Sequence, residues 1–290
     1  MQIFRQLSGL DELRGWWWRA GEGSALVPTM GALHDGHLTL IAEGKCHAAR
    51  VVATIFVNPL QFNQKSDLER YPRTEEADLA KLEASGCDAV WLPPVEEIYP
   101  PGFATTVSVS GLSDRWEGEF RPRHFDGMAT VVAKLLIATA PDFAIFGEKD
   151  WQQLAIVQQL VRDLSIDTEI IGLPTVREAD GLAMSSRNAL LSRDERAAAV
   201  ALPQALEEAR AAIGAGEHIL VSTLLAVARA KLIAAGFASV DYLALVDAAT
   251  LEPLDHAQGD MRLISAATIG KTRLIDNVRV EMATLSPASM

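Results

Sequence analysis

Short apolar runs alternate with helical patterns through residues 24–173, and this alternation constrains the fold more than any other feature of the chain. Residues 51–57 form an unbroken, β-branched apolar run, which is typical of a strand covered on both faces of a sheet. Further strands are expected at 24–27, 89–92, 143–146 and 169–173, and helices at 37–49, 74–84, 128–139 and 151–164. Strands joined by helices in this order predict an α/β, doubly wound parallel sheet.

The pattern changes after Pro174. Residues 194–235 have helical periodicity with one break at 214–216, which predicts two adjoining helices. Strand-like runs at 241–246, 261–269 and 272–280 are close enough together to pair antiparallel. We therefore expect a first domain of residues 1–174, with a half-exposed edge strand at 105–109, and a smaller α+β domain of residues 175–290. A chain of 290 residues is long enough for both.

Charge and cysteine content disfavour several classes of protein. The chain carries 38 acidic and 26 basic residues, and this net charge of −12 argues against the basic face that nucleic-acid binding requires. Cys46 and Cys87 stand in no metal-binding spacing, so we expect two buried thiols and no disulfide framework. No apolar run reaches the length of a membrane span, and the N-terminus has no signal-peptide core. We expect a cytoplasmic protein without nucleic-acid or membrane partners.

A loop rich in glycine and histidine, PTMGALHDGH at residues 28–37, follows the first predicted core strand. Backbone N–H groups and the dipole of the next helix favour an anion at this point, and the glycines let a ligand approach the main chain. His34 and His37 can face the same ligand. A metal site and a solvated glycine turn are alternatives, but the loop geometry favours a phosphate.

Two other polar clusters also follow predicted strands. Asn58 and Gln61 carry amides that can bind hydroxyl and carboxylate groups, although an Asn-Pro sequence is often only a turn. Lys149 supplies a positive charge for phosphate, and Gln153 projects from the first turn of the next helix, although Lys149 alone fits a solvated helix start. An acidic helix start, with Glu75, Glu76 and Asp78, is interpreted as a solvated face, with magnesium binding by one of them as the alternative.

The expected domain junction carries a polar loop, MSSR at residues 184–187. Two hydroxyls followed by a guanidinium could close on a polyphosphate, and a junction offers the mobility that closure requires. A serine-rich linker is the alternative interpretation.

Taken together, these motifs resemble the pantoate–β-alanine ligase (pantothenate synthetase) family of the HxGH-bearing, nucleotidyltransferase-like superfamily. The resemblance spans the chain, through the motif LIDN at residues 274–277. It implies a Rossmann-like N-terminal domain, a smaller C-terminal lid domain and a cytoplasmic homodimer. It also implies magnesium with ATP as a substrate, and pantoate and β-alanine as the other two substrates.

The resemblance implies a role for each motif. His37 would be the proton donor, and His34, Lys149 and Arg187 are the other candidate catalytic residues. Gln61 would hold pantoate and then β-alanine, Gln153 would hold pantoate, and Asn58 is a further candidate for substrate binding. ATP contacts are expected from Met30, Gly31, Ala32, Leu33, His34, Asp35, Gly36, His37, Gly147, Glu148, Lys149, Asp150, Val176, Met184, Ser185, Ser186 and Arg187. No metal ligand is assigned.

The implied reaction has two steps. The carboxylate of pantoate attacks the α-phosphorus of ATP to give pantoyl adenylate and pyrophosphate, and the amine of β-alanine then displaces AMP. A nucleotidyltransferase acting on a phosphorylated acceptor and a regulatory nucleotide-binding module remain alternatives, whereas acidity and the lack of a tRNA-binding domain disfavour an aminoacyl-tRNA synthetase. Two departures from the family pattern are visible: Asp35, where Glu is common, and Arg123, in a segment where Gly is common.

Overall fold

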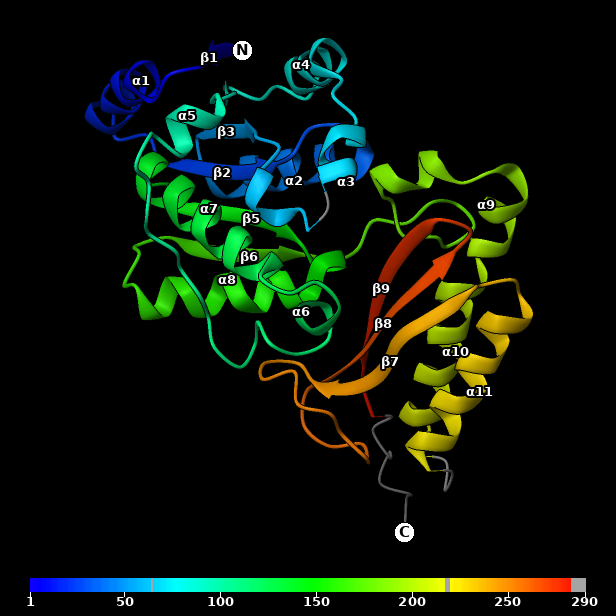
Figure 1. Ribbon diagram of the computed structural model, residues 1–290. Coiled ribbons are helices and arrows are strands. Elements are labelled where there is room, and N and C mark those ends of the chain that lie inside the picture. Colours follow the sequence, from blue (N-terminus) through cyan, green and yellow to red (C-terminus); the bar gives the residue numbers. More distant parts are fainter. Residues whose placement is uncertain (64, 217–219, 283–290) are drawn as a thin grey trace. The chain divides into compact units, whose positions relative to one another are not determined.

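The computed structural model describes residues 1–63, 65–216 and 220–282, and the chain divides into two compact units, Met1–Val176 and Arg177–Met290 (Figure 1). The N-terminal unit is built on a parallel sheet in the order β1-β4-β3-β2-β5-β6. Its strands are β1 (Gln2–Phe4), β2 (Ser24–Thr29), β3 (Arg50–Ile55), β4 (Ala89–Trp91), β5 (Phe143–Gly147) and β6 (Glu169–Leu173). The predicted doubly wound, Rossmann-like sheet is confirmed.

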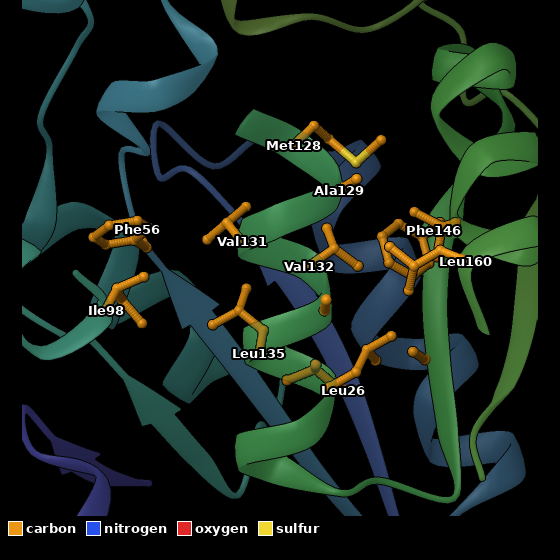
Figure 2. Close-up of a cluster of buried hydrophobic side chains, with 14 of the residues drawn as sticks. Leu26, Phe56, Ile98, Met128, Ala129, Val131, Val132, Leu135, Phe146 and Leu160 are labelled. Atoms are coloured by element: carbon orange, nitrogen blue, oxygen red, sulfur yellow. The ribbon is translucent and has the colours of Figure 1, made fainter. Parts of the chain in front are cut away.

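Helices cover both faces of this sheet because alternate strand residues point to opposite sides. On one face, Leu26 of β2 packs in a cluster with α1 (Leu7–Arg19), α7 (His124–Thr139) and α8 (Trp151–Asp163). Figure 2 shows Val132 and Leu135 of α7 in this cluster, with Leu26 below them. On the other face, Ala25 and Val27 pack against α2 (Asp35–His47) and α4 (Glu75–Ala84).

Short elements join the strands and helices of this unit: η1 (Pro59–Gln61), α3 (Lys65–Arg70), α5 (Val95–Ile98), α6 (Glu117–Phe120) and η2 (Glu148–Asp150). The strand β1 and the helix α1 at the N-terminus were not predicted. The edge strand expected at 105–109 is wrong, since these residues form no strand. The backbone N–H of Val107 donates instead to Thr130 Oγ1 at 2.9 Å, so this segment is bonded to α7 and not to the edge of the sheet.

Helix α7 begins four residues before its predicted start, directly after Arg123. Arg123 has φ 65°, in the left-handed region that favours glycine. The departure noted at this position therefore falls on a residue whose backbone conformation is strained for a side chain.

The C-terminal unit contains an antiparallel sheet, covered by helices, with strands in the order β7-β8-β9. Three helices form where two were expected, because Pro203 cannot donate the backbone hydrogen bond that would continue the first helix through this turn. The elements are η3 (Ser186–Leu190), α9 (Arg193–Ala199), α10 (Ala201–Gly214), α11 (Val221–Ala234), β7 (Ser239–Asp247), β8 (Met261–Ile269) and β9 (Thr272–Val280). Their buried side chains form a separate hydrophobic core within this unit.

The two cysteines differ in environment. Cys87 is buried, and burial raises the pKa of its thiol to about 11. Cys46 lies in the last turns of α2 and is exposed, so the expectation of a buried thiol is wrong there. In the described parts of the chain, no helix combines the length and the apolar character needed to cross a membrane.

The contact between α7 and η1 leaves no room for a side chain at Gly127. A Cβ there would lie 2.2 Å from the carbonyl oxygen of Leu60, and backbone cannot move aside cheaply. We expect Gly127→Ala to lower the free energy of unfolding by about 3 kcal/mol, measured by urea unfolding.

Gly15→Ala is the matched control for this change. A Cβ at Gly15, within α1, would meet only the Arg19 side chain at 3.6 Å. This variant should gain roughly 0.5–1 kcal/mol through helix propensity. Equal stability of the two variants would contradict the steric interpretation.

Candidate active site

The strand order brings two of the predicted motifs to one edge of the sheet. Strand β2 lies between β3 and β5, so the connections leaving β2 and β5 diverge from neighbouring carboxyl ends. Such a switch point is where open α/β sheets bind ligands. The loop before α2 follows β2, and η2 with Lys149 and Asp150 follows β5. Both side chains act electrostatically on His37, so the structure brings the first and third motifs together.

The loop after β2 is held from behind by α4. The buried carboxylate of Asp78 accepts hydrogen bonds from the backbone N–H groups of Ala32 and Leu33 at 2.9 and 2.8 Å. Lys81 Nζ donates to the carbonyl of Leu33 at 2.6 Å. The loop turns through positive φ at Gly31, where a Cβ would lie 3.1 Å from the Asp78 carboxylate.

These contacts correct one expectation and bear on another. Asp78 is not part of a solvated face, because it is buried and bonded to the loop. The sequence signal for this was its position one turn before the buried Leu82, on the same side of α4. The amides of Ala32 and Leu33 are also occupied, so an anion would meet the first turn of α2 and the histidine side chains rather than these two N–H groups.

The two histidines lie against each other at the start of α2, with ring centroids 4.1 Å apart. The backbone N–H of His34 donates to Nδ1 of His37 at 3.3 Å, so the proton of a neutral His37 ring is on Nε2. Burial, and then the positive charges of His34, Lys149 and Lys81, lower the pKa of His37 to about 3, against the opposing effect of Asp150. His37 is therefore a neutral hydrogen-bond donor at physiological pH.

Gln61 is held at the end of η1, after β3. Asn58 Nδ2 donates to Gln61 Oε1 at 2.8 Å, and His124 contacts the backbone carbonyl of Gln61 at 2.9 Å. The side chain of Asn58 is completely buried, and its remaining positions are taken by Gly127, Leu60 and Tyr99. In this arrangement Asn58 supports Gln61 and has no hydrogen-bonding position left over, and its direct contact with a substrate stays a prediction.

The two neighbouring glutamines of α8, Gln152 and Gln153, differ in their hydrogen bonding. Gln152 is buried and bonds the segment before α6, donating to the carbonyls of Leu112 and Arg115 at 2.7 and 2.8 Å and accepting from the N–H of Glu117. Gln153 is half-buried and forms no side-chain hydrogen bond with any of the described residues. The structure therefore leaves the glutamine singled out in the sequence free for a ligand.

In the C-terminal unit, the loop before η3 is braced by the LIDN motif. The buried carboxylate of Asp276 accepts two hydrogen bonds from the guanidinium of Arg177, at 2.8 and 2.9 Å. Asn188 Nδ2 donates to Glu178 Oε1 and to the carbonyl of Ala183, closing the loop on itself. This bracing gives residues 274–277 a structural role that sequence reasoning missed.

Within the same loop, the side chain of Ser185 accepts a hydrogen bond from the backbone N–H of Arg187 and so caps η3. The guanidinium of Arg187 forms no hydrogen bond or ion pair with the described residues, and it is half-buried. Val176, Met184 and Ser186 are also half-buried. Hydrogen bonds thus hold the loop backbone, while the guanidinium of Arg187 is left available.

A family model described as pantoate-beta-alanine ligase matches residues 2–279. The chain belongs to this family. It is 54% identical over 283 residues to a pantothenate synthetase of Rhizorhabdus wittichii, covering 98% of this chain and 100% of the relative. The reaction of the family, ATP-dependent condensation of pantoate with β-alanine, is therefore the reaction of this chain.

Solved structures agree with this assignment. A pantothenate synthetase of Thermus thermophilus superposes with a TM-score of 0.90 at 44% identity, covering 97% of this chain and 100% of that one. A pantoate-beta-alanine ligase of Francisella tularensis, complexed with beta-gamma ATP and beta-alanine, superposes with a TM-score of 0.81 at 32% identity. That likeness covers 96% of this chain and 97% of that one.

The bracing of the histidine loop by Asp78 can be tested with Asp78→Asn. The amide can accept one of the two loop N–H groups but presents a donor to the other, so we expect the free energy of unfolding to fall by about 2 kcal/mol and the KM for ATP to rise. Glu76→Gln, an exposed carboxyl on the same helix, is the matched control and should change neither quantity. Wild-type values for both variants would contradict the role of Asp78.

The lowered pKa of His37 predicts a pH dependence of stability. As pH falls below about 6.5, the unfolded chain binds a proton at this residue that the folded protein does not bind until about pH 3. Stability is therefore lost as the pH falls through this window. Between pH 7.5 and 5, urea unfolding should show wild type losing about 1–2 kcal/mol more than His37→Gln. An equal loss in both proteins would contradict a neutral His37.

Proposed function

We propose that the chain forms pantoyl adenylate at the carboxyl edge of the N-terminal sheet and then transfers the pantoyl group to β-alanine. The observation that carries this proposal is the meeting of a neutral His37, a donor through Nε2, with Lys149 at the switch point between β2 and β5. Donors and cations around one point suit the stabilisation of a triphosphate, and the arrangement provides no nucleophile that would need to be acylated.

In the first step, a carboxylate oxygen of pantoate forms a bond to the α-phosphorus of ATP while the bond to the β-phosphate oxygen breaks. Negative charge moves onto the departing pyrophosphate. The Nε2–H of His37 donates a hydrogen bond to this group, and Lys149, His34 and Arg187 stabilise the remaining charge. Phosphate binding raises the pKa of His37 and so favours the protonated ring, whose positive charge stabilises the departing pyrophosphate and whose proton can be given to it.

In the second step, the amine of β-alanine attacks the carbonyl carbon of the adenylate, AMP leaves, and the amine loses a proton. Gln61 and Gln153 hold pantoate, and Gln61 then holds β-alanine. Asn58 contributes by fixing Gln61. The chain binds and orients the reacting groups, so no covalent enzyme intermediate is required.

The proposed ATP site consists of residues 30–37, 147–150, 176 and 184–187. Within this set, Asp78 behind the loop and Asp276 behind residues 184–187 hold the backbone in place. Residues 1–174 would bind ATP and pantoate, and residues 175–290 would act as the lid that contributes Arg187. We also propose a cytoplasmic homodimer without nucleic-acid or membrane partners, which the family resemblance supports.

Mg²⁺ would accompany ATP. Among the described residues, no group of three or more His, Cys, Asp or Glu side chains is placed to hold a metal ion. This fits an ion bound mainly by phosphate oxygens and water. Asp150 is exposed next to His37 and is the carboxylate that would complete the coordination. When bound, the ion neutralises charge on the triphosphate.

The reaction order can be measured with purified protein. ATP and pantoate alone should release pyrophosphate up to one equivalent per site, and AMP should accumulate only when β-alanine is added. Lys149→Ala and Arg187→Ala should each slow pyrophosphate release about a hundredfold. Lys271→Ala, at an exposed turn of the C-terminal unit, is the matched control and should keep the wild-type rate. AMP release without β-alanine would overturn the proposed order.

A further inference from the structure

Three side chains from two segments of the chain form a hydrogen-bonded series that ends at Gln61. The hydroxyl of Tyr99 lies 2.9 Å from Asn58 Oδ1, and Asn58 Nδ2 lies 2.8 Å from Gln61 Oε1. Tyr99 follows α5, some forty residues along the chain from Asn58. It belongs to none of the motifs discussed above.

The direction of every bond in this series is set by two backbone groups. The N–H of Leu60 can only donate, and it points to one end of the Asn58 amide at 3.2 Å, so that end is the oxygen. The carbonyl of Gly127 can only accept, and it faces the other end at 2.9 Å, so that end is the nitrogen. Asn58 is therefore oriented by its neighbours and not by a choice of amide flip.

The orientation of Asn58 then determines that of Gln61. Because Asn58 presents an N–H to Gln61, the Gln61 amide must turn its oxygen toward Asn58. Its Nε2 forms no hydrogen bond with the described residues. Nε2 of Gln61 is thus available to a ligand as a hydrogen-bond donor, which suits a carboxylate or a hydroxyl oxygen.

Tyr99 completes this arrangement by donating to the second lone pair of Asn58 Oδ1. Its ring packs against Phe103 and Phe56, with centroids 5.0 and 6.1 Å apart. Burial raises the pKa of the phenol well above its ordinary value, so the hydroxyl keeps its proton over the working pH range. Without this hydroxyl, Asn58 would lose one of the two donors that hold its oxygen.

We propose that Tyr99 is a positioning residue for pantoate: its hydroxyl holds Asn58 in the orientation that the two backbone groups select, and Asn58 in turn presents Gln61 to the substrate as a hydrogen-bond donor. The proposal rests on the proposed contact between Gln61 and pantoate. Tyr99 itself acts only through Asn58 and Gln61, so its effect should appear in the kinetics of pantoate and not in those of ATP.

The test is a double-mutant cycle on pantoate-dependent pyrophosphate release. Tyr99→Phe keeps the ring and its packing, and it should lower kcat/KM for pantoate about fivefold while the KM for ATP stays within about twofold. Gln61→Ala should cause a larger loss. In the Gln61→Ala background, Tyr99→Phe should have almost no further effect, because the group through which it acts is gone.

Thr168→Val is the matched control for the lost hydroxyl. Thr168 Oγ1 donates to the carbonyl of Pro141 at 2.8 Å and is also buried, but it precedes β6 and so lies at the opposite end of the strands from Gln61. Its loss should lower the melting temperature without changing kcat/KM for pantoate.

The outcomes separate the two proposals. A wild-type kcat/KM for pantoate in Gln61→Ala would overturn the proposed pantoate contact and, with it, the role of Tyr99. An impaired Gln61→Ala with an unchanged Tyr99→Phe would overturn only the role of Tyr99. So would full additivity of the two substitutions, or an equal rise in the KM values for pantoate and ATP, since either would indicate a general structural effect.

Discussion

The parallel pairing of β2 with β3 on one side and β5 on the other is the constraint on which the N-terminal unit depends. Because all three strands run in the same direction, their carboxyl ends lie at one edge of the sheet. The histidine loop, Gln61 and Lys149 each follow one of these ends. Residues that are more than a hundred positions apart in the chain, such as His37 and Lys149, therefore come close enough to interact electrostatically.

Buried polar side chains give this edge its local precision. Asp78 bonds the histidine loop, Asn58 bonds Gln61, Gln152 bonds the segment before α6, and Asp276 bonds Arg177. A buried polar group without partners is costly, so each of these residues strongly favours one arrangement of its neighbours. Two of them lie beside residues that we propose contact a substrate: Asn58 beside Gln61, and Gln152 next to Gln153 in the chain. The chain thus separates side chains that hold the site from those that are available to a substrate.

The electrostatics of the site differ from those of the whole chain. The formal net charge is −12, yet the groups acting on His37 include Lys81 and Lys149. Local cations and neutral donors are what a triphosphate and a carboxylate substrate require, and they act over short distances where the overall charge is screened. The lowered pKa of His37 follows from the same arrangement, since burial and nearby positive charge both disfavour the protonated ring.

The sequence by itself determined the alternation of strands and helices, the order of the motifs and the family, because hydrophobic periodicity and loop chemistry depend on residues close together in the chain. The sequence did not reveal that residues 105–109 bond to α7, that Asp78 is buried or that all the hydrogen-bonding positions of Asn58 are occupied. Only the tertiary structure decided these points, since the partners of Asp78 and Tyr99 lie 45 and 41 residues away. Arg123 shows both sides: its identity was visible as a departure in the sequence, but its left-handed backbone is imposed by the start of α7. Contacts of this range depend on how the chain packs, and a local pattern does not identify the partners.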